Sequence, residues 1–341
     1  MKMFTGFMRG VNLGGWYSQC VHTREHYDSF IGDDDFAVIA SWGLDHVRLP
    51  VDHELLEDRE GLPAEEGYAR LKRAAELCDN NGLNLVIDLH KAAGYSFDPG
   101  EGEVGFFESP DLQERFYKLW ESIAESMSGY KNVAFELLNE VTEKEYGPVW
   151  NRIASECIGR IRRIAPETPI LVGGYYHNSA VAVKDIDVPI DDNIVFNFHC
   201  YEPLIYTHQG AYWMPGMKRD FRISLHSTYA EFENAAREMG AESCSGLGSL
   251  PQEGVLTAQY YKDFMREAVE TAEKRGVALY CGEYGVIDCA DPYETLEWYK
   301  LINAAFAEYG IGRAAWSYRR MDFGLSDERM DEVREELVKY L

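Results

Sequence analysis

DNNGLNLVIDLH, residues 79–90, holds the local features that decide the fold. Asp-Asn-Asn-Gly is a turn sequence, and the apolar run after it has the length of one buried strand. A stretch with helical spacing, 64–81, leads into the turn, and another, 110–128, comes after the strand. The segment therefore predicts one unit of an alternating helix and strand pattern.

The same alternation continues through the rest of the chain. The other predicted strands are 7–13, 44–49, 132–140, 169–174, 194–201, 277–283 and 312–318. The other predicted helices are 33–42, 149–164, 258–275, 292–309 and 328–340. Eight strands with helical crossovers, and no glycine-rich phosphate loop, favour a closed α/β barrel over an open doubly wound sheet. We therefore expect one (β/α)₈ TIM-barrel catalytic domain over residues 1–341.

The connection after the sixth strand is too long for one loop and one helix. About 75 residues separate Tyr201 from Val277, where about 25 to 30 would suffice. Within it, 224–239 has the spacing of an extra amphipathic helix. We expect 207–256 to be an inserted subdomain, or lid, at the C-terminal rim of the barrel. A surface insertion without ordered structure is the alternative.

The amino-acid composition limits which binding partners and which cellular compartment we expect. The formal charge is −25, from 33 Lys and Arg against 58 Asp and Glu, which disfavours binding to nucleic acid or to an anionic membrane surface. The chain contains no apolar run of about 18 residues, so no transmembrane helix is predicted. The first residues lack a signal-peptide pattern, and the seven cysteines contain no C-x-x-C pair. These features predict a cytoplasmic protein, and they leave its oligomeric state open.

Polar residues end almost every predicted strand. They are Asn12, Arg48, His90, Asn139, Glu140, His199, Tyr201, Glu283 and Trp316. Taken singly, such a Glu is usually a surface or ion-pairing carboxylate, such a His a structural residue and such a Trp part of the core. The C-terminal ends of barrel strands share one face, and active sites of this fold lie there. The set therefore predicts an active site at that face.

Two of these residues, Glu140 and Glu283, are carboxylates on the fourth and seventh strands. Opposite walls of a small barrel can hold two carboxyl groups at about 5 Å, the spacing of retaining glycosidases. We expect the apolar FELLN run, together with a neighbouring sugar, to keep Glu140 protonated as a general acid. We expect Arg48 and a tyrosine hydroxyl to keep Glu283 ionised. Glu136, four residues before Glu140, is interpreted as a buried ion-pair partner inside the barrel.

FELLNE (135–140) and YCGEYGV (280–286) resemble the two catalytic strands of glycoside hydrolase family 5, the cellulase family. The resemblance extends in order along the chain. It includes VNLGGW (11–16), DHVRLP (45–50), DLH (88–90), NFHCYEP (197–203), THQGAYW (207–213) and WSYRRMDFG (316–324). The resemblance implies a retaining hydrolase of β-linked glucans, similar to compact single-domain endoglucanases.

The resemblance also implies a role for each matching residue. Glu140 would be the acid/base and Glu283 the nucleophile. Asn139 would bind the sugar 2-hydroxyl, Arg48 and Tyr201 would hold Glu283, and His90 and His199 would bind sugar hydroxyls or steady the acid/base. Trp316 would be the platform under the sugar ring. Trp213 is interpreted either as an extra stacking residue or as core.

Several alternatives are weighed against this hypothesis. A metal-dependent barrel would favour a His-x-His pair on the first strand, which reads VNLGG. A phosphate-binding barrel would favour basic, glycine-rich loops where the chain has the acidic EYGVIDCADP. An inactive sugar-binding barrel would typically lack one of the two carboxylates.

The expected partner is a neutral oligosaccharide or polysaccharide, with no cofactor or metal. Short β-1,4- or mixed-linked gluco-oligosaccharides are the first prediction for the substrate. An exo-acting β-mannosidase or a β-mannanase is the alternative. Lys91 and Cys200 differ from residues common in the family, and they leave that choice open.

Overall fold

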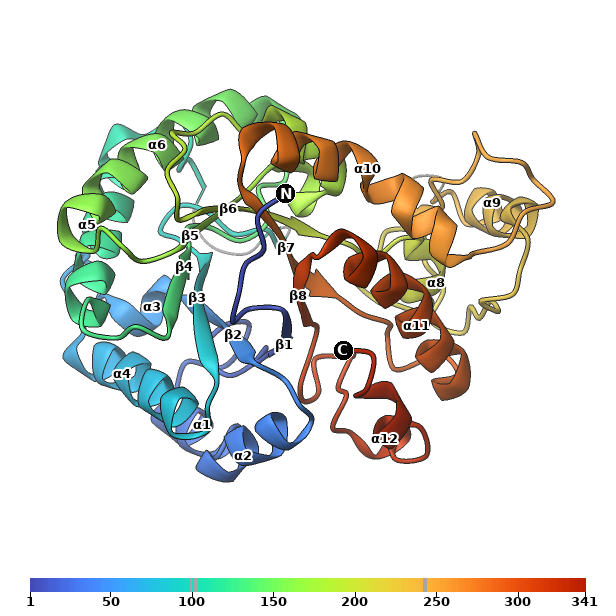
Figure 1. The fold of residues 1–341 in the computed structure, drawn as a ribbon, viewed down its shortest axis with the longest axis horizontal. Helices are drawn as coiled ribbons and strands as arrows, with labels where there is room; N and C mark the ends of the chain where they lie inside the picture. Colours follow the sequence, from blue (N-terminus) through green and yellow to red (C-terminus); the bar gives the residue numbers. More distant parts are fainter. Residues whose placement is uncertain (99, 101–103, 242–243) are drawn as a thin grey trace.

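The computed structural model describes residues 1–98, 100, 104–241 and 244–341, and it shows a closed barrel of eight parallel strands (Figure 1). Neighbours in the sequence are neighbours in the barrel, and β8 closes against β1. The strands are β1 Arg9–Asn12, β2 His46–Asp52, β3 Asn84–Lys91, β4 Val133–Glu136, β5 Ile170–Gly173, β6 Ile194–His199, β7 Ala278–Tyr284 and β8 Gly312–Ala315. The predicted (β/α)₈ barrel is confirmed.

Helices surround the barrel and connect successive strands (Figure 1). The long helices are α2 Asp33–Ser41, α4 Glu65–Asn80, α5 Pro110–Met127, α6 Gly147–Ile164, α9 Tyr229–Glu238, α10 Ala258–Arg275 and α11 Pro292–Tyr309. The short helices are α1 Arg24–Ser29, α3 His53–Leu56, α7 Tyr175–Asn178, α8 Leu204–Thr207 and α12 Arg334–Leu337. None of the helices in the described part of the chain is long and apolar enough to cross a membrane.

Helix α5 shows how the sequence produces this arrangement. Ser109 caps its first turn by accepting a hydrogen bond from the Leu112 amide, and Pro110 occupies the first helical position, where no amide hydrogen is needed. Its apolar face includes Trp120, which is fully buried and donates a hydrogen bond to the Leu137 carbonyl just after β4. The helix is therefore attached to the segment that leads to Glu140.

An apolar layer fills the bottom of the barrel, below the polar residues. Phe4 and Phe7 precede β1 and stack on each other with ring centroids 4.2 Å apart, and Tyr280 packs edge-on against Phe4. These rings belong to a cluster with alanine and valine side chains from the strands. The layer closes the barrel bottom, so that the polar side chains above it face only the C-terminal end.

Several predicted elements differ in extent from the observed ones. Strand β4 ends at Glu136 rather than Glu140, and Glu140 itself has a φ of 35°, in the left-handed region rather than the strand region. The predicted helix 328–340 is instead a 3₁₀ turn, Glu328–Met330, followed by the short helix α12.

The long connection after β6 contains the short helix α8 and the longer helix α9. Helix α9 begins at Tyr229 rather than at Ser224, because Thr228 forms a capping box with Glu231. Figure 1 shows α9 beside α8 at the edge of the barrel. The side chain of Phe232, on α9, is fully buried. Residues 242–243 of the predicted insertion lie outside the described residues. The interpretation of 207–256 as a lid stays a prediction.

Candidate active site

A cleft of about 1710 Å³ lies at the C-terminal ends of the strands. Seven of the nine predicted site residues line it: His90, Glu140, His199, Tyr201, Trp213, Glu283 and Trp316. The other two, Arg48 and Asn139, are fully buried, and they contact the network around Glu283. The structure therefore brings all nine residues to one end of the barrel.

Glu283 lies near the end of β7 and is held by two side chains from other strands. Arg48 donates from Nη1 to Oε1 at 2.7 Å, and the Tyr201 hydroxyl donates to Oε2 at 2.9 Å. Both carboxylate oxygens are therefore fixed before any ligand binds. The nearby guanidinium compensates the negative charge that a carboxylate nucleophile carries.

Arg48 is the centre of a buried charge network. Its guanidinium pairs with both oxygens of Glu136 at 2.7 Å and with Asp88 at 3.0 Å, in addition to Glu283. Burial raises the pKa of Glu136 even though Arg48 opposes that shift. The interpretation of Glu136 as a buried ion-pair partner is confirmed. One guanidinium thus joins the nucleophile candidate to the interior of the barrel.

Asn139 is oriented by the same guanidinium. Its Oδ1 accepts a hydrogen bond from Arg48 Nη2 at 2.8 Å. Its Nδ2 is buried and has no hydrogen-bond partner among the described residues. Because a buried donor without a partner is costly, this amide is suited to a ligand hydroxyl.

Glu140 lies on the loop after β4, and its main chain is fixed by Tyr95. The Tyr95 hydroxyl donates to the Glu140 carbonyl at 2.7 Å and accepts from the Thr142 amide at 2.9 Å. The Glu140 carboxylate contacts two histidines. Its Oε1 lies 2.8 Å from His199 Nδ1, and its Oε2 lies 3.0 Å from His177 Nδ1.

These contacts overturn the expected protonation of Glu140. Burial raises the pKa of Glu140, but the hydrogen bonds from His177 and His199 outweigh it, and the net pKa lies well below the usual range. The expectation that apolar neighbours keep Glu140 protonated is wrong, because FELLN packs its apolar side chains into the core while the carboxylate faces histidines.

The two carboxylates are close enough for direct attack on a sugar. Oxygen atoms of Glu140 and Glu283, together with a ring nitrogen of His199, lie within 4.8 Å of one another. Retaining glycosidases separate their carboxyl groups by about 5 to 5.5 Å, and inverting enzymes by about 6.5 to 9.5 Å. The spacing of the two carboxylates is closer to that of the retaining class.

His90 and Trp316 form one wall of the cleft. The two rings are nearly parallel, at 3°, with centroids 5.8 Å apart. Asp88 accepts from His90 Nδ1 at 2.5 Å and raises the pKa of His90, although burial acts in the opposite direction. Asp88 thereby fixes the orientation of the imidazole and leaves its other nitrogen for the cleft.

Aromatic rings line a second wall of the cleft, and the segment 207–256 contributes some of them. Phe323 packs against Tyr201, His208 and Trp213, with ring centroids 5.4 to 6.4 Å apart. Trp213 is 41% exposed and lines the cleft, so core packing does not account for its place. Such an exposed ring suits stacking on a sugar face.

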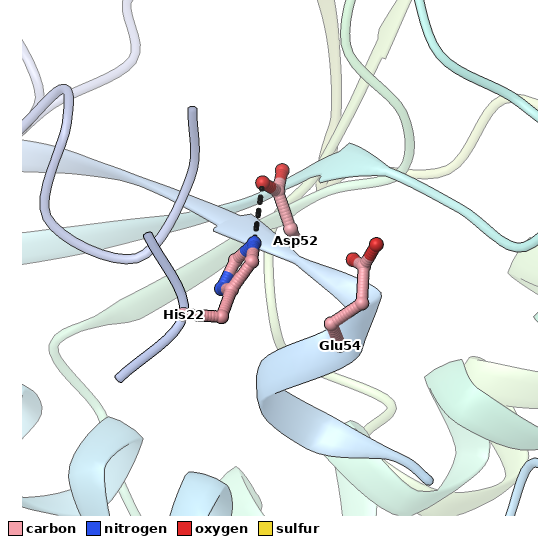
Figure 2. A group of neighbouring side chains, drawn as sticks. All are labelled: His22, Asp52 and Glu54. Carbon is pink, nitrogen blue, oxygen red and sulfur yellow. Dashed lines mark ion pairs between the residues drawn. The ribbon is translucent and has the colours of Figure 1, made fainter. Parts of the chain in front are cut away.

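The cleft also has a polar wall with a possible metal-ligand geometry (Figure 2). Atoms of His22, Asp52 and Glu54 lie within 4.8 Å of one another. However, Asp52 already accepts hydrogen bonds from Ser18 and the Gln19 amide, and its carboxylate lies 3.3 Å from His22 Nε2. The hydrogen bond with Asp52 raises the pKa of His22 to about 10, so His22 and Asp52 form an ion pair at neutral pH.

Three residues of the site were not predicted: Tyr95, Asp88 and His177. Two of them, Asp88 and His177, had a signal in the sequence. Asp88 precedes His90 on a predicted strand, at the same face. His177 belongs to GGYYHNS, which directly follows the fifth predicted strand, the one strand for which no polar residue was chosen. Tyr95 lies in a loop, where spacing gives no information on direction.

Comparisons with known proteins agree with this geometry. Residues 8–322 match the family model described as cellulase, glycosyl hydrolase family 5. The chain is 46% identical to Cellodextrinase A of Ruminococcus flavefaciens over 90% of this chain and 84% of that protein. It is 36% identical to Endoglucanase C of Acetivibrio thermocellus over 98% of both.

Solved structures share the fold at lower identity. A structure described as an endoglucanase has a TM-score of 0.77 at 20% identity, covering 98% of this chain and 97% of that one. Cel5A of Thermotoga maritima in complex with mannotriose has a TM-score of 0.75 at 21% identity, with 98% and 97% covered. The match of the family model to nearly the whole chain confirms the resemblance noted in the sequence: the chain is a glycoside hydrolase that belongs to family 5, the cellulase family.

Proposed function

We propose that the protein hydrolyses β-1,4-linked or mixed-linkage gluco-oligosaccharides with retention of configuration. The observation that carries the proposal is the carboxylate pair, with oxygens of Glu140 and Glu283 within 4.8 Å of each other in different surroundings. This spacing matches double displacement through a covalent glycosyl-enzyme intermediate.

In the first step, Glu283 attacks the anomeric carbon and forms an ester with it, while Glu140 protonates the departing glycosidic oxygen. Arg48 and Tyr201 keep the attacking oxygens in place. The Asn139 amide, which lacks a partner, donates to the 2-hydroxyl of the sugar. Trp316 provides the floor on which that sugar rests.

In the second step, Glu140 acts as a base. It takes a proton from water, which attacks the same carbon and releases Glu283 as a carboxylate. Because attack occurs twice on the same carbon, the configuration is retained. Neither step requires a metal or an organic cofactor.

The relatives support a β-glucan substrate. Cellodextrinase A and Endoglucanase C carry names for cleavage of β-glucans, and both cover most of this chain. The mannotriose complex of the Thermotoga maritima neighbour keeps β-mannosides as the second candidate. The acidic composition is compatible with a neutral sugar as the substrate, because such a ligand carries no charge to repel.

The test compares β-1,4-linked gluco- and manno-oligosaccharides of equal length, with products separated over time and their anomeric form followed by NMR. Glu140→Ala and Glu283→Ala are the loss-of-function variants, and Glu145→Ala, an exposed glutamate shortly after Glu140, is the matched control. Initial release of the β-anomer from gluco-oligosaccharides, lost in both variants, supports the proposal. Initial release of the α-anomer overturns retention, and exclusive cleavage of mannosides overturns the substrate.

A further inference from the structure

His177 lines the cleft but has no part in the proposed mechanism. It is 55% exposed, it lines the cleft, and its Nδ1 lies 3.0 Å from Oε2 of Glu140. The other histidine on Glu140, His199, is only 2% exposed and contacts Oε1. His199 Nδ1 also lies 3.6 Å from Glu283, so Oε1 is the oxygen on the nucleophile side.

This asymmetry decides which oxygen of Glu140 a leaving group can reach. The contact to Oε1 is made by a buried ring, whereas the contact to Oε2 is made by a ring open to the cleft. A glycosidic oxygen must approach within hydrogen-bond distance of the acid. Oε2 is therefore the oxygen that meets the leaving group, and the substrate must replace His177 there.

The main chain holds His177 in a conformation that proteins rarely adopt. Tyr176, His177 and Asn178 have φ values of 51°, 54° and 54°, three successive non-glycine residues in the left-handed region. The amides of Tyr176 and His177 donate to the carbonyls of Thr142 and Val141, directly after Glu140. Backbone strain of this kind persists where surrounding contacts enforce it, and here those contacts place the imidazole on the acid/base.

We propose that His177 is a positioning residue that holds the proton that Glu140 delivers to the leaving group. In the resting enzyme the proton is on Nδ1 of the His177 imidazolium, which donates to the Glu140 carboxylate. When the glycosidic oxygen approaches, the proton moves from Nδ1 to Oε2 and leaves His177 neutral. Glu140 then transfers that proton to the departing oxygen. This inference rests on the proposed role of Glu140 as acid/base.

The second half-reaction restores the resting state. Glu140, now a carboxylate, takes a proton from the attacking water, and the hydroxide so formed breaks the ester to Glu283. The proton returns from Oε2 to Nδ1 of His177 when the product leaves. The pair of His177 and Glu140 holds one proton before the cycle and one proton after it. The proton given to the leaving group is replaced by the proton taken from water.

The charges around the pair determine its response to pH. Glu140, Glu143 and Asp98 face His177 and raise its pKa above the ordinary value, although burial acts in the opposite direction. Other titratable groups lie near Glu140 itself: His199, His208, Glu283, Tyr95 and Tyr201. The pKa of the Glu140 carboxyl is lowered, whereas the pKa of the His177 imidazole is raised. The two side chains together therefore retain one proton to a higher pH than an unassisted carboxyl in the same place.

The experiment uses His177→Gln, which keeps a donor to Glu140 but has no proton to transfer. The substrates are cellotetraose, whose leaving group needs a proton, and 2,4-dinitrophenyl β-cellobioside, whose leaving group needs none. At pH 7.5 we expect kcat/KM on cellotetraose to fall about tenfold or more, with near wild-type values at pH 5. The aryl substrate should change by less than about twofold. His226→Gln, a histidine removed outside the cleft, should behave as wild type.

Two outcomes with an active wild type would overturn the proposal about His177 alone. One is an unchanged pH profile on cellotetraose. The other is an equal loss on both substrates at every pH, which indicates a purely structural role. A wild-type protein that cleaves neither substrate overturns the proposed function, and the His177 proposal with it.

A second measurement does not depend on turnover. Histidine NMR should show the His177 imidazole titrating above its ordinary pKa in the wild type and returning toward it in Glu140→Gln. A His177 titration that is unaffected by Glu140→Gln contradicts the shared proton, whatever the kinetics show.

Discussion

Glu283 and Glu140 are the same residue type at the same end of one barrel, but the structure holds them by different means. Glu283 is part of a strand, and its partner Arg48 is fully buried and also pairs with Asp88 and Glu136. Glu140 lies beyond its strand, and its partners are two histidines, one of them half exposed. The core fixes the charge beside Glu283, whereas the rim offers Glu140 a partner that can exchange a proton.

Breaking the support of Glu283 should have the largest effect, because that support is part of the core. Arg48→Met leaves Asp88, Glu136 and Glu283 without their shared cation. We expect the free energy of unfolding to fall by about 3 to 5 kcal/mol, the range measured when one partner of a buried ion pair is removed. Urea denaturation followed by circular dichroism measures this loss.

Glu140→Gln is the control for that prediction. It removes a carboxylate from the rim, where the partners are histidines that can release their protons, and we expect it to change stability by less than about 1 kcal/mol. Similar losses in the two variants would contradict the difference between a core-supported and a rim-supported carboxylate.

The next effect concerns chemistry alone. Glu140→Ala should slow cleavage of cello-oligosaccharides by about 100-fold to 10,000-fold, because a poor leaving group needs a general acid. With an aryl cellobioside, ester hydrolysis limits the rate, and added azide should restore turnover and give a β-glycosyl azide. Azide needs no base to attack, so product analysis by mass spectrometry and NMR identifies Glu140 as the acid/base. Rescue of Glu283→Ala by azide with formation of the same β-anomer would contradict the assignment.

A smaller effect is expected when one hydrogen bond to Glu283 is removed. Tyr201→Phe deletes the hydroxyl that donates to Oε2 at 2.9 Å and keeps the ring that packs on Phe323. A hydrogen bond to a charged group is worth about 1.5 to 3 kcal/mol, so kcat/KM should fall by about 10-fold to 150-fold with little change in melting temperature. Wild-type kcat/KM would show that Arg48 alone orients the nucleophile.

The smallest effect is expected at the aromatic wall. Trp213→Ala removes a half-exposed ring that stacking on sugars would use. Such a contact contributes about 0.5 to 1.5 kcal/mol, so we expect KM for longer oligosaccharides to rise about 2-fold to 10-fold at constant kcat. Cellobiosides too short to reach the ring are the internal control. An equal rise in KM for short and long substrates would place Trp213 beside the reacting bond instead.

The sequence predicted the barrel because its signals are local. DNNGLNLVIDLH shows a turn and a buried strand within twelve letters, and eight such units leave few ways to form a closed sheet. His90 and His199 were predicted in the same way, since a polar residue that ends an apolar run lies at the C-terminal end of its strand.

The surroundings of Glu140 could not be predicted in that way. The direction of its carboxylate depends on a φ of 35° and on Tyr95, which lies 45 positions earlier in the chain. An apolar run next to a glutamate does not show whether the carboxylate faces that run or turns away from it. The prediction that Glu140 is protonated is wrong for this reason. The position of His177 could not be predicted because left-handed backbone has no periodic sequence pattern.

The Tyr95 hydroxyl joins the loop after β3 to the loop that carries Glu140, with one hydrogen bond to the Glu140 carbonyl and one from the Thr142 amide. Laboratory evolution of this enzyme toward new sugars would begin with such loops, because they tolerate sequence change better than strands do. Here the loop after β3 is not free for redesign as a separate module. A library that randomises this loop should keep Tyr95 constant. A variant that gains a new sugar contact but loses the Tyr95 hydroxyl also loses the contacts that orient its acid/base, Glu140.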